Sequence, residues 1–347
     1  MGPADVPKRR CAGDSSRAYA FVVLQSPRLA TLREGPQLIY SNILDAMGNT
    51  PLIRLNRLVT PDMADILVKN ESLNVGASIK TRTAYQMILG AEERGEITPN
   101  TIIVEPTSGN QGVGLALIAA VRGYRARIIM PDSVSEERRK LVRHYGAEVV
   151  VVHDRGNIGE CIDECIQLAY KMADEDPNVF VPQQFKNTDN LKAHLLHTGQ
   201  EILQDVDGPI HGFCSGFGTA GTLTGIGQVL RQANPHIRIW AVEPENAAIL
   251  HGKPVGSHVQ MGIGDGLIPQ IMDLQVFDEK CIVTDQEALE VARRLAAEEG
   301  LMVGISSGSN VAAAMRLARE LGPGHTVVTL LPDTAERYFS TELFAGE

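Results

Sequence analysis

Short apolar runs alternate with amphipathic stretches of ten to fifteen residues from about Ile39 to the end of the chain. Runs of this length are typical of buried strands, and the stretches between them have the 3.6-residue spacing of helices. Strands that alternate with helices pair in parallel through right-handed crossovers. The sequence therefore predicts an α/β fold with open, twisted, mainly parallel sheets flanked by helices.

The expected elements can be placed by residue number. We expect strands at Thr101–Val104, Ala126–Met130, Glu148–His153, Val179–Pro182, Ile210–Cys214, Ile237–Val242 and Thr326–Leu331. Helices are expected at Thr83–Glu93, Val113–Val121, Ser135–His144, Asn157–Met172, Leu191–Leu203, Leu223–Gln232, Gln286–Glu299 and Asn310–Leu321.

Length and charge narrow the class of protein. The 347 residues are enough for about two domains, and we expect them at 39–185 (smaller and mobile) and 186–347, with part of the early chain crossing over. The 42 acidic residues outnumber the 32 basic ones, which argues against binding to nucleic acid or to an anionic membrane. Residues 1–38 carry six basic and three acidic residues, and we expect a flexible N-terminal extension there.

Five cysteines occur without a Cys-x-x-Cys pair. This count supports neither a zinc site nor a disulfide framework, and it favours a reducing, cytoplasmic setting. No metal is expected. No run of 18 apolar residues is present, so no membrane-spanning helix is expected either.

Four turns between a strand and a helix are unusually rich in small polar residues. In open parallel sheets ligands bind at the carboxyl ends of the strands, so these turns are the candidate site. They lie at 74–82 (NVGASIKTR), 106–112 (PTSGNQG), 215–222 (SGFGTAGT) and 304–309 (GISSGS).

Each turn offers a different chemistry. Lys80 stands at the start of a helix, where its charge opposes the helix dipole, and this cost suggests a phosphate contact or an imine. The loop at 106–112 offers backbone N–H groups and hydroxyls suited to a carboxylate or phosphate. An ordinary helix cap by Ser108 or Asn110 is the alternative.

The loop at 215–222 matches the pattern Gly-x-Gly-x-x-Gly, and Glu243 follows at the end of the next strand. This arrangement is typical of dinucleotide binding. A phosphorylated cofactor that also forms an imine would use the same helix terminus, and it would explain Lys80 and the loop at 106–112 as well.

Taken in order, these motifs resemble the cysteine synthase/cystathionine β-synthase family, the fold-type II enzymes that use pyridoxal 5′-phosphate (PLP). The resemblance spans about Ile39 to Phe344 and implies a tryptophan synthase β-like fold. The segments that carry it are 43–52 (ILDAMGNTPL), 105–110 (EPTSGN), 183–185 (QQF), 218–222 (GTAGT), 262–264 (GIG), 304–308 (GISSG) and 331–333 (LPD).

The resemblance implies a role for each matching residue. Lys80 would hold PLP as an imine and act as the catalytic base. Asn110 would contact the ring hydroxyl of PLP, and Ser306 would contact the ring nitrogen. The phosphate would be bound by the loop residues Gly218, Thr219, Ala220, Gly221 and Thr222. The substrate carboxylate would be held by Thr107, Ser108, Gly109, Gln111 and Gln184.

The chain departs from the family pattern at several positions. Gln111 replaces the usual Thr, and Ala220 replaces a Gly, which we expect to be tolerated if its φ stays negative. Val75, Ala77 and Thr81 replace the usual Pro, Gly and Asp near the lysine.

Asp265 stands where members that use sulfide usually have a small residue. A carboxylate facing the substrate Cβ would orient water or an amine and repel hydrosulfide. A solvated loop aspartate or a helix cap is the alternative interpretation of Asp265.

The resemblance implies β-replacement on an O-activated L-serine. The favoured activity is an O-acetylserine or O-phosphoserine sulfhydrylase that forms L-cysteine through an aminoacrylate, in a homodimer. Asp265 raises a cysteine desulfhydrase or an amine-using, diaminopropionate-type synthase as alternatives. An NAD-dependent oxidoreductase that uses Gly216–Gly221, and a non-catalytic binding subunit, are alternatives of other classes.

Overall fold

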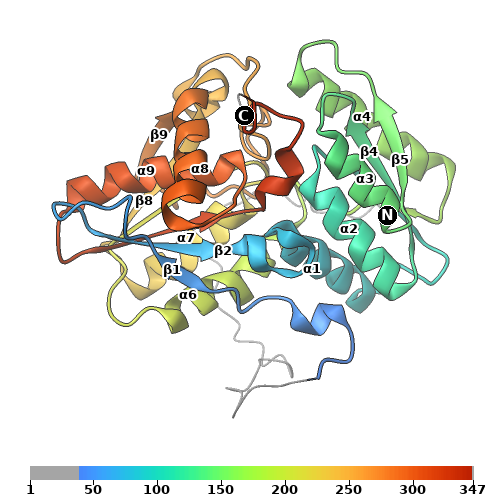
Figure 1. Ribbon diagram of the computed structural model, residues 1–347. Coiled ribbons are helices and arrows are strands. Elements are labelled where there is room, and N and C mark those ends of the chain that lie inside the picture. Colours follow the sequence, from blue (N-terminus) through green and yellow to red (C-terminus); the bar gives the residue numbers. More distant parts are fainter. Residues whose placement is uncertain (1–38, 346–347) are drawn as a thin grey trace, which may run out of the picture. The chain divides into compact units, whose positions relative to one another are not determined.

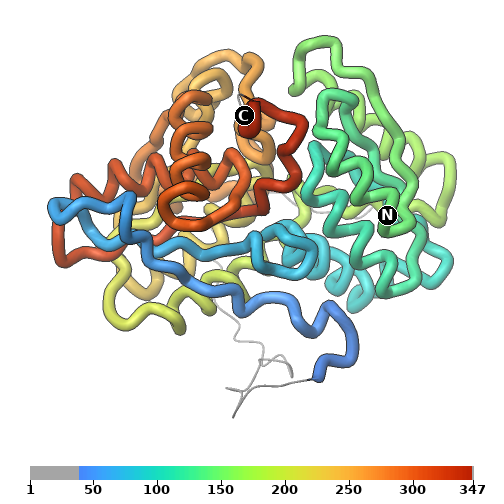
Figure 2. The backbone as a smooth tube through the Cα atoms, in the orientation of Figure 1, coloured from blue at the N-terminus to red at the C-terminus, as the bar shows by residue number. Residues whose placement is uncertain are grey.

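The computed structural model describes residues 39–345, and the residues from Ser41 onward form one compact unit (Figures 1 and 2). The expected extension at residues 1–38 lies outside the described residues and stays a prediction. The boundary expected between residues 185 and 186 also stays a prediction.

Two open sheets organise the described chain. The six-stranded sheet has the order β1-β2-β10-β7-β8-β9, and its only antiparallel pair among the described residues is β1 with β2. The four-stranded sheet has the order β5-β4-β3-β6 and is parallel throughout. The strands are β1 (Leu52–Arg54), β2 (Asp65–Asn70), β3 (Ile102–Pro106), β4 (Arg125–Pro131), β5 (Glu148–Val152), β6 (Val179–Phe180), β7 (Gly212–Gly216), β8 (Arg238–Pro244), β9 (Glu279–Val283) and β10 (Thr326–Leu331).

Helices flank both sheets. In Figure 1, α8 and α9 lie beside β8 and β9, whereas α2, α3 and α4 lie with β4 and β5. The helices are α1 (Lys80–Glu93), α2 (Asn110–Arg122), α3 (Glu136–His144), α4 (Ile158–Glu175), α5 (Thr188–Ala193), α6 (Gly199–Asp205), α7 (Gly221–Ala233), α8 (Asp285–Glu299) and α9 (Ile305–Leu321). The predicted α/β class with two mainly parallel sheets is confirmed.

All seven expected strands are present, with ends shifted by up to two residues. Three further strands were not expected, namely β1, β2 and β9. The helix expected at Leu191–Leu203 is divided, because a π-helical segment at His194–Thr198 separates α5 from α6.

The prediction of a loop at Gly304–Ser309 is wrong, because α9 already begins at Ile305. Its small residues reflect close packing between helices rather than a turn. A Cβ on Gly308 would lie 1.9 Å from the carbonyl oxygen of Ala288 on α8. Ser306 therefore lies in the first turn of a buried helix.

Cys161, Cys165, Cys214 and Cys281 are free thiols with buried side chains. No described helix is long and apolar enough to cross a membrane. Among residues 39–345, no group of His, Cys, Asp and Glu side chains is arranged to hold a metal ion.

Arg82 is the centre of a buried ionic network under α1. Its guanidinium group donates to both carboxylate oxygens of Glu71 and to Glu201, while the buried Lys69 also pairs with Glu201. Buried charges persist only when they are paired and hydrogen-bonded. The network links β2 and α1 to α6, and so fixes the start of α1.

Arg82→Met is expected to lower the free energy of unfolding by about 3–5 kcal/mol, because it leaves the fully buried Glu71 carboxylate without its cationic partner. Urea unfolding followed by circular dichroism measures the change. Lys140→Met removes an exposed pair with Glu136 and is the matched control, with an expected cost of about 0–1 kcal/mol. Equal losses in the two variants would contradict this account of the network.

Candidate active site

Lys80 is the first residue of α1 and lines two adjoining hollows between the sheets. Its Nζ atom lies 3.3 Å from Oγ1 of Thr219. The first hollow is lined by the loop after β7, and the second hollow is lined by the loop after β3. The structure thus brings together the turns that the sequence indicated, at the carboxyl ends of parallel strands as the α/β rule requires.

The loop 218–222 leads from β7 into α7 and needs its glycines for close approach. A Cβ on Gly218 would lie 2.6 Å from the carbonyl oxygen of Gly262, and one on Gly221 would lie 2.2 Å from Oδ1 of Asn190. Gly218, Thr219, Ala220 and Thr222 line the hollow beside Lys80. The first N–H groups of a helix have no partner within it, so this terminus suits a phosphate.

Ala220 was expected to be tolerated in this loop if its φ stayed negative, and this expectation about φ is wrong. Its φ is +63°, in the left-handed region, instead of negative. An alanine in this region costs roughly 1–2 kcal/mol relative to the right-handed conformation. The packing of the loop imposes the conformation, because Ala220 is buried at the start of α7.

Two residues that the sequence did not indicate hold this loop. The fully buried Asn190 donates to Oγ1 of Thr219 at 2.9 Å and to the carbonyl oxygen of Gln184 at 2.8 Å. His194, also fully buried, lies 3.2 Å from Oγ1 of Thr222. Both come from α5 and the π-helical segment, which no motif in the sequence marks.

The loop after β3 presents an unused donor to the second hollow. Gln111 accepts a hydrogen bond from Oγ1 of Thr83 at 2.6 Å, but its buried Nε2 atom has no partner. Gly109 has a φ of +148° and donates its N–H to Oγ1 of Thr107. The helix begins at Asn110 without a side-chain cap, so the alternative of an ordinary cap is wrong.

Glu105 fixes the position of Gln184. The two oxygens of its carboxyl group accept the backbone N–H groups of Gln183 and Gln184, each at 2.9 Å, and it has no exposed surface. Burial raises the pKa of Glu105 to about 8, although the two N–H donors act in the opposite direction. The Gln184 side chain donates to the carbonyl oxygen of Pro106, so it lies against the loop after β3.

Asn110 and Ser306 line the hollow that contains loop 218–222, and Ser108 and Asp265 line the other. The candidate site residues therefore line the hollows beside Lys80, except Gly109 and Gly221, which line neither hollow. Asn110 donates from Nδ2 to the Asp333 carboxylate at 2.6 Å. The roles proposed for these side chains remain predictions.

Lys80 and Asp265 influence each other across the second hollow. Burial lowers the pKa of the Lys80 ammonium, and the Asp265 carboxylate partly offsets this effect. Burial raises the pKa of Asp265, and Lys80 again acts against it. Both groups are thus displaced toward their neutral forms. A neutral amine is the form that attacks a carbonyl carbon or takes up a proton.

Glu243 is not free to bind the ribose of a dinucleotide. It is fully buried, and its carboxylate accepts the N–H of Leu250 at 2.7 Å and contacts Nδ1 of His251 at 2.7 Å. The acidic residue required by the dinucleotide hypothesis is therefore occupied within the protein.

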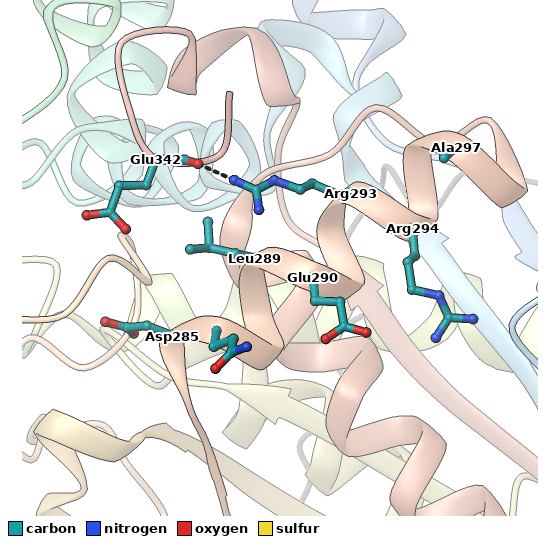
Figure 3. A pocket seen from close by; sticks show the side chains of 8 residues that line it. Asp285, Leu289, Glu290, Arg293, Arg294, Ala297 and Glu342 are labelled. Carbon is teal, nitrogen blue, oxygen red and sulfur yellow. Dashed lines mark hydrogen bonds between the residues drawn. The ribbon is translucent and has the colours of Figure 1, made fainter. Parts of the chain in front are cut away.

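A larger hollow of about 530 Å³ lies along α8, which follows β9 (Figure 3). It is shallow, and most of its lining is charged, including Asp285, Glu290 and Arg294. Arg293 crosses it and donates to the carbonyl oxygen of Glu342, as the dashed line in Figure 3 shows. We assign the chemistry to the hollows around Lys80, because only there do strand ends, glycine turns and an amine converge.

The family model of pyridoxal-phosphate-dependent enzymes matches residues 43–333. The chain belongs to this family. A cysteine synthase of Staphylococcus aureus (strain Mu50) is 44% identical over 305 residues, which cover 88% of this chain and 97% of that protein.

Two solved structures show the same fold at similar coverage. The crystal structure of an O-ureido-L-serine synthase has a TM-score of 0.84 and 41% identity, and the match covers 89% of this chain and 96% of that one. A hydrogen sulfide-producing enzyme from Fusobacterium nucleatum has a TM-score of 0.82 and 36% identity, with coverages of 86% and 100%. The predicted family, fold type and cofactor are confirmed, and the protein is a PLP-dependent, cysteine synthase-like enzyme.

The residues around Lys80 fit PLP. The glycine cradle before α7 suits its phosphate, Lys80 offers the amine for its aldehyde, and the orphaned Nε2 of Gln111 offers a donor to an amino-acid carboxylate. An NAD-dependent oxidoreductase explains neither Lys80 nor this donor. The presence of Lys80, the glycine cradle and the Gln111 donor together also argues against a non-catalytic binding subunit.

We expect the contribution of Glu105 to the stability of the enzyme to fall as pH rises toward 8. The Glu105 carboxyl group keeps its proton up to about pH 8 in the folded chain but loses it above about pH 4.5 when unfolded. The folded state thus binds the extra proton between these values, which is a slope of up to about 1.4 kcal/mol per pH unit.

Urea unfolding of the wild type and of Glu105→Gln at pH 6, 7, 8 and 9 tests this expectation. The advantage of the wild type over the variant should shrink from pH 6 to pH 8 and then level off. Glu148→Gln, an exposed change on β5, is the control. A difference that stays constant across these pH values would contradict the assignment.

Proposed function

We propose that the enzyme converts O-acetyl-L-serine, or O-phospho-L-serine, and sulfide into L-cysteine by replacement at Cβ. The lining of the second hollow carries this proposal. It combines a hydroxyl-rich loop (Thr107 and Ser108), the free amide donor of Gln111, and Gln184, all of which line the same hollow as Lys80. Relatives named cysteine synthase support it.

Bound PLP supplies the electron sink that stabilises negative charge at Cα. The donors of the loop after β3 bind and orient the substrate carboxylate. Lys80 Nζ, held near Thr219, removes the Cα proton as the neutral amine favoured by burial, and returns it after the nucleophile has added to Cβ. Ile162 and Phe185 border the hollow and help to exclude water.

Addition of O-acetyl-L-serine to the purified enzyme is expected to change its visible absorption spectrum, and subsequent sulfide to restore it with formation of L-cysteine. Lys80→Ala is expected to lower turnover by about 10²–10⁴-fold, because the proton carrier is lost. Lys171→Ala, an exposed lysine on α4, is the control. Unaltered turnover in Lys80→Ala would exclude this function.

Asp265 favours a second candidate. Its carboxylate borders the same hollow as Lys80 and Gln111, where a nucleophile must approach Cβ. A carboxylate at this place repels hydrosulfide and accepts a proton from water or an amine. An amine-using synthase, or a lyase that releases sulfide from cysteine, is therefore the alternative. Among the structural neighbours are an O-ureido-L-serine synthase and a hydrogen sulfide-producing enzyme.

Comparison of Asp265→Ala and Asp265→Asn separates the two candidates. If the carboxylate activates a neutral nucleophile, both variants should lose about 10²-fold or more in the water and amine reactions and gain in kcat/KM for sulfide. Product analysis with sulfide, ammonia or no added nucleophile measures the partition. If the ratio of products formed from sulfide, ammonia and water is unchanged in both variants, Asp265 only supports the structure of its loop.

A homodimer in the cytoplasm remains our proposal, on the basis of the family resemblance. The remaining partners proposed are the amino-acid substrate and the small nucleophile, with neither nucleic acid nor membrane.

A further inference from the structure

A buried charged cluster lies directly behind Asn110. It consists of Arg138 on α3, Asp333 after β10, and Arg337 and Tyr338 in the 3-10 turn Ala335–Tyr338. In Figure 1 this last part of the chain lies beside α3, and Ser135 donates to the carbonyl oxygen of Arg337 at 2.9 Å. The cluster thus joins α3, which packs against β5 of the four-stranded sheet, to the segment that follows β10 of the six-stranded sheet.

The charges in the cluster constrain one another. Asp333 has no exposed surface, accepts the Tyr338 hydroxyl at 2.8 Å, and lies 3.7 Å from Nη2 of Arg138. The Arg138 guanidinium group stacks 4.6 Å above the Tyr338 ring. Arg337 is 3% exposed and donates to the carbonyl oxygen of Gly76. Removal of either Arg138 or Asp333 would leave the other charge buried without its ion-pair partner, which favours the observed arrangement.

The Asn110 amide lies between two opposite charges of this cluster. Its Nδ2 donates to Asp333 at 2.6 Å, and its Oδ1 accepts from Arg337. A reversed amide would place its oxygen against the carboxylate and its NH₂ group against the guanidinium group. One orientation is therefore enforced electrostatically. Only one of the two Nδ2 hydrogens is used by Asp333.

We propose that Asp333 and Arg337 are positioning residues that set the orientation of Asn110, so that its second N–H is available to the ring oxygen of PLP. Asn110 lines both hollows around Lys80, which places its side chain at the cofactor rather than behind it. The inference depends on the role proposed for Asn110, and not on the identity of the donor or nucleophile.

A double-mutant cycle on cofactor affinity tests the inference. Apo forms of the wild type, Asn110→Ala, Asp333→Asn and the double variant are titrated with PLP, and binding is followed by visible absorption and equilibrium dialysis. Each single change is expected to weaken PLP binding by about tenfold or more. In the Asn110→Ala background, Asp333→Asn should have no further effect.

A second cycle protects the test against misfolding, because Asp333→Asn leaves Arg138 without its ion-pair partner. Arg337→Lys keeps the charge but loses the planar fork that reaches both Asn110 and Gly76. Arg337→Lys should likewise weaken PLP binding when Asn110 is present and have no further effect in the Asn110→Ala background. Glu336→Gln, an exposed change in the same turn, is the control and should bind PLP like the wild type.

Two results would overturn the inference. In the first, Asp333→Asn and Arg337→Lys weaken PLP binding equally with and without Asn110, which would show a general structural effect. In the second, Asn110→Ala itself leaves PLP affinity unchanged. Neither result bears on the proposed reaction, which is decided separately by turnover of O-acetyl-L-serine in the wild type.

Discussion

The placement of one amine in a desolvated gap is the constraint on which the site depends. Lys80 begins α1, where the positive end of the helix and the loss of water both disfavour the ammonium form. Such a lysine persists only if the surrounding structure holds it there. The Arg82 network fixes the helix start, and Thr219 and Asp265 border the amine from the loops that follow β7 and β8.

The same gap explains why the polar contacts around it connect distant parts of the chain. Asn190 joins the Gln184 segment to the loop before α7, and Glu105 joins the end of β3 to Gln183 and Gln184. Each is fully buried and binds backbone atoms of another element. Loops held in this way keep their geometry without a bound ligand, and preorganised donors lose little entropy when a ligand arrives.

The sequence predicted the class of fold and the position of the site, because hydrophobic spacing and glycine-rich turns are local signals. Lys80, Gly218 and Thr107 were found in this way. Asn190 and His194 were missed, because they act through contacts across the fold and stand in an ordinary amphipathic helix.

Local spacing also failed where packing overrides propensity. The segment 304–309 has the composition of a loop, yet the contact between Gly308 and Ala288 makes it part of a helix. The short strands β1 and β2 are stabilised by pairing with each other and with β10, which no window of sequence reveals.

Backbone strain shows how the site is held together. Four non-glycine residues among 39–345 have a positive φ, and three of them, Ala77, Gln183 and Ala220, lie beside the turns that converge on Lys80. Alanine and glutamine gain nothing locally from this conformation, which costs roughly 1–2 kcal/mol for each residue. The surrounding packing must therefore impose it, as is common at functional sites. The hollows are shaped by the fit of whole loops against each other, so the frame of the site does not depend on any single wall residue, Asp265 included.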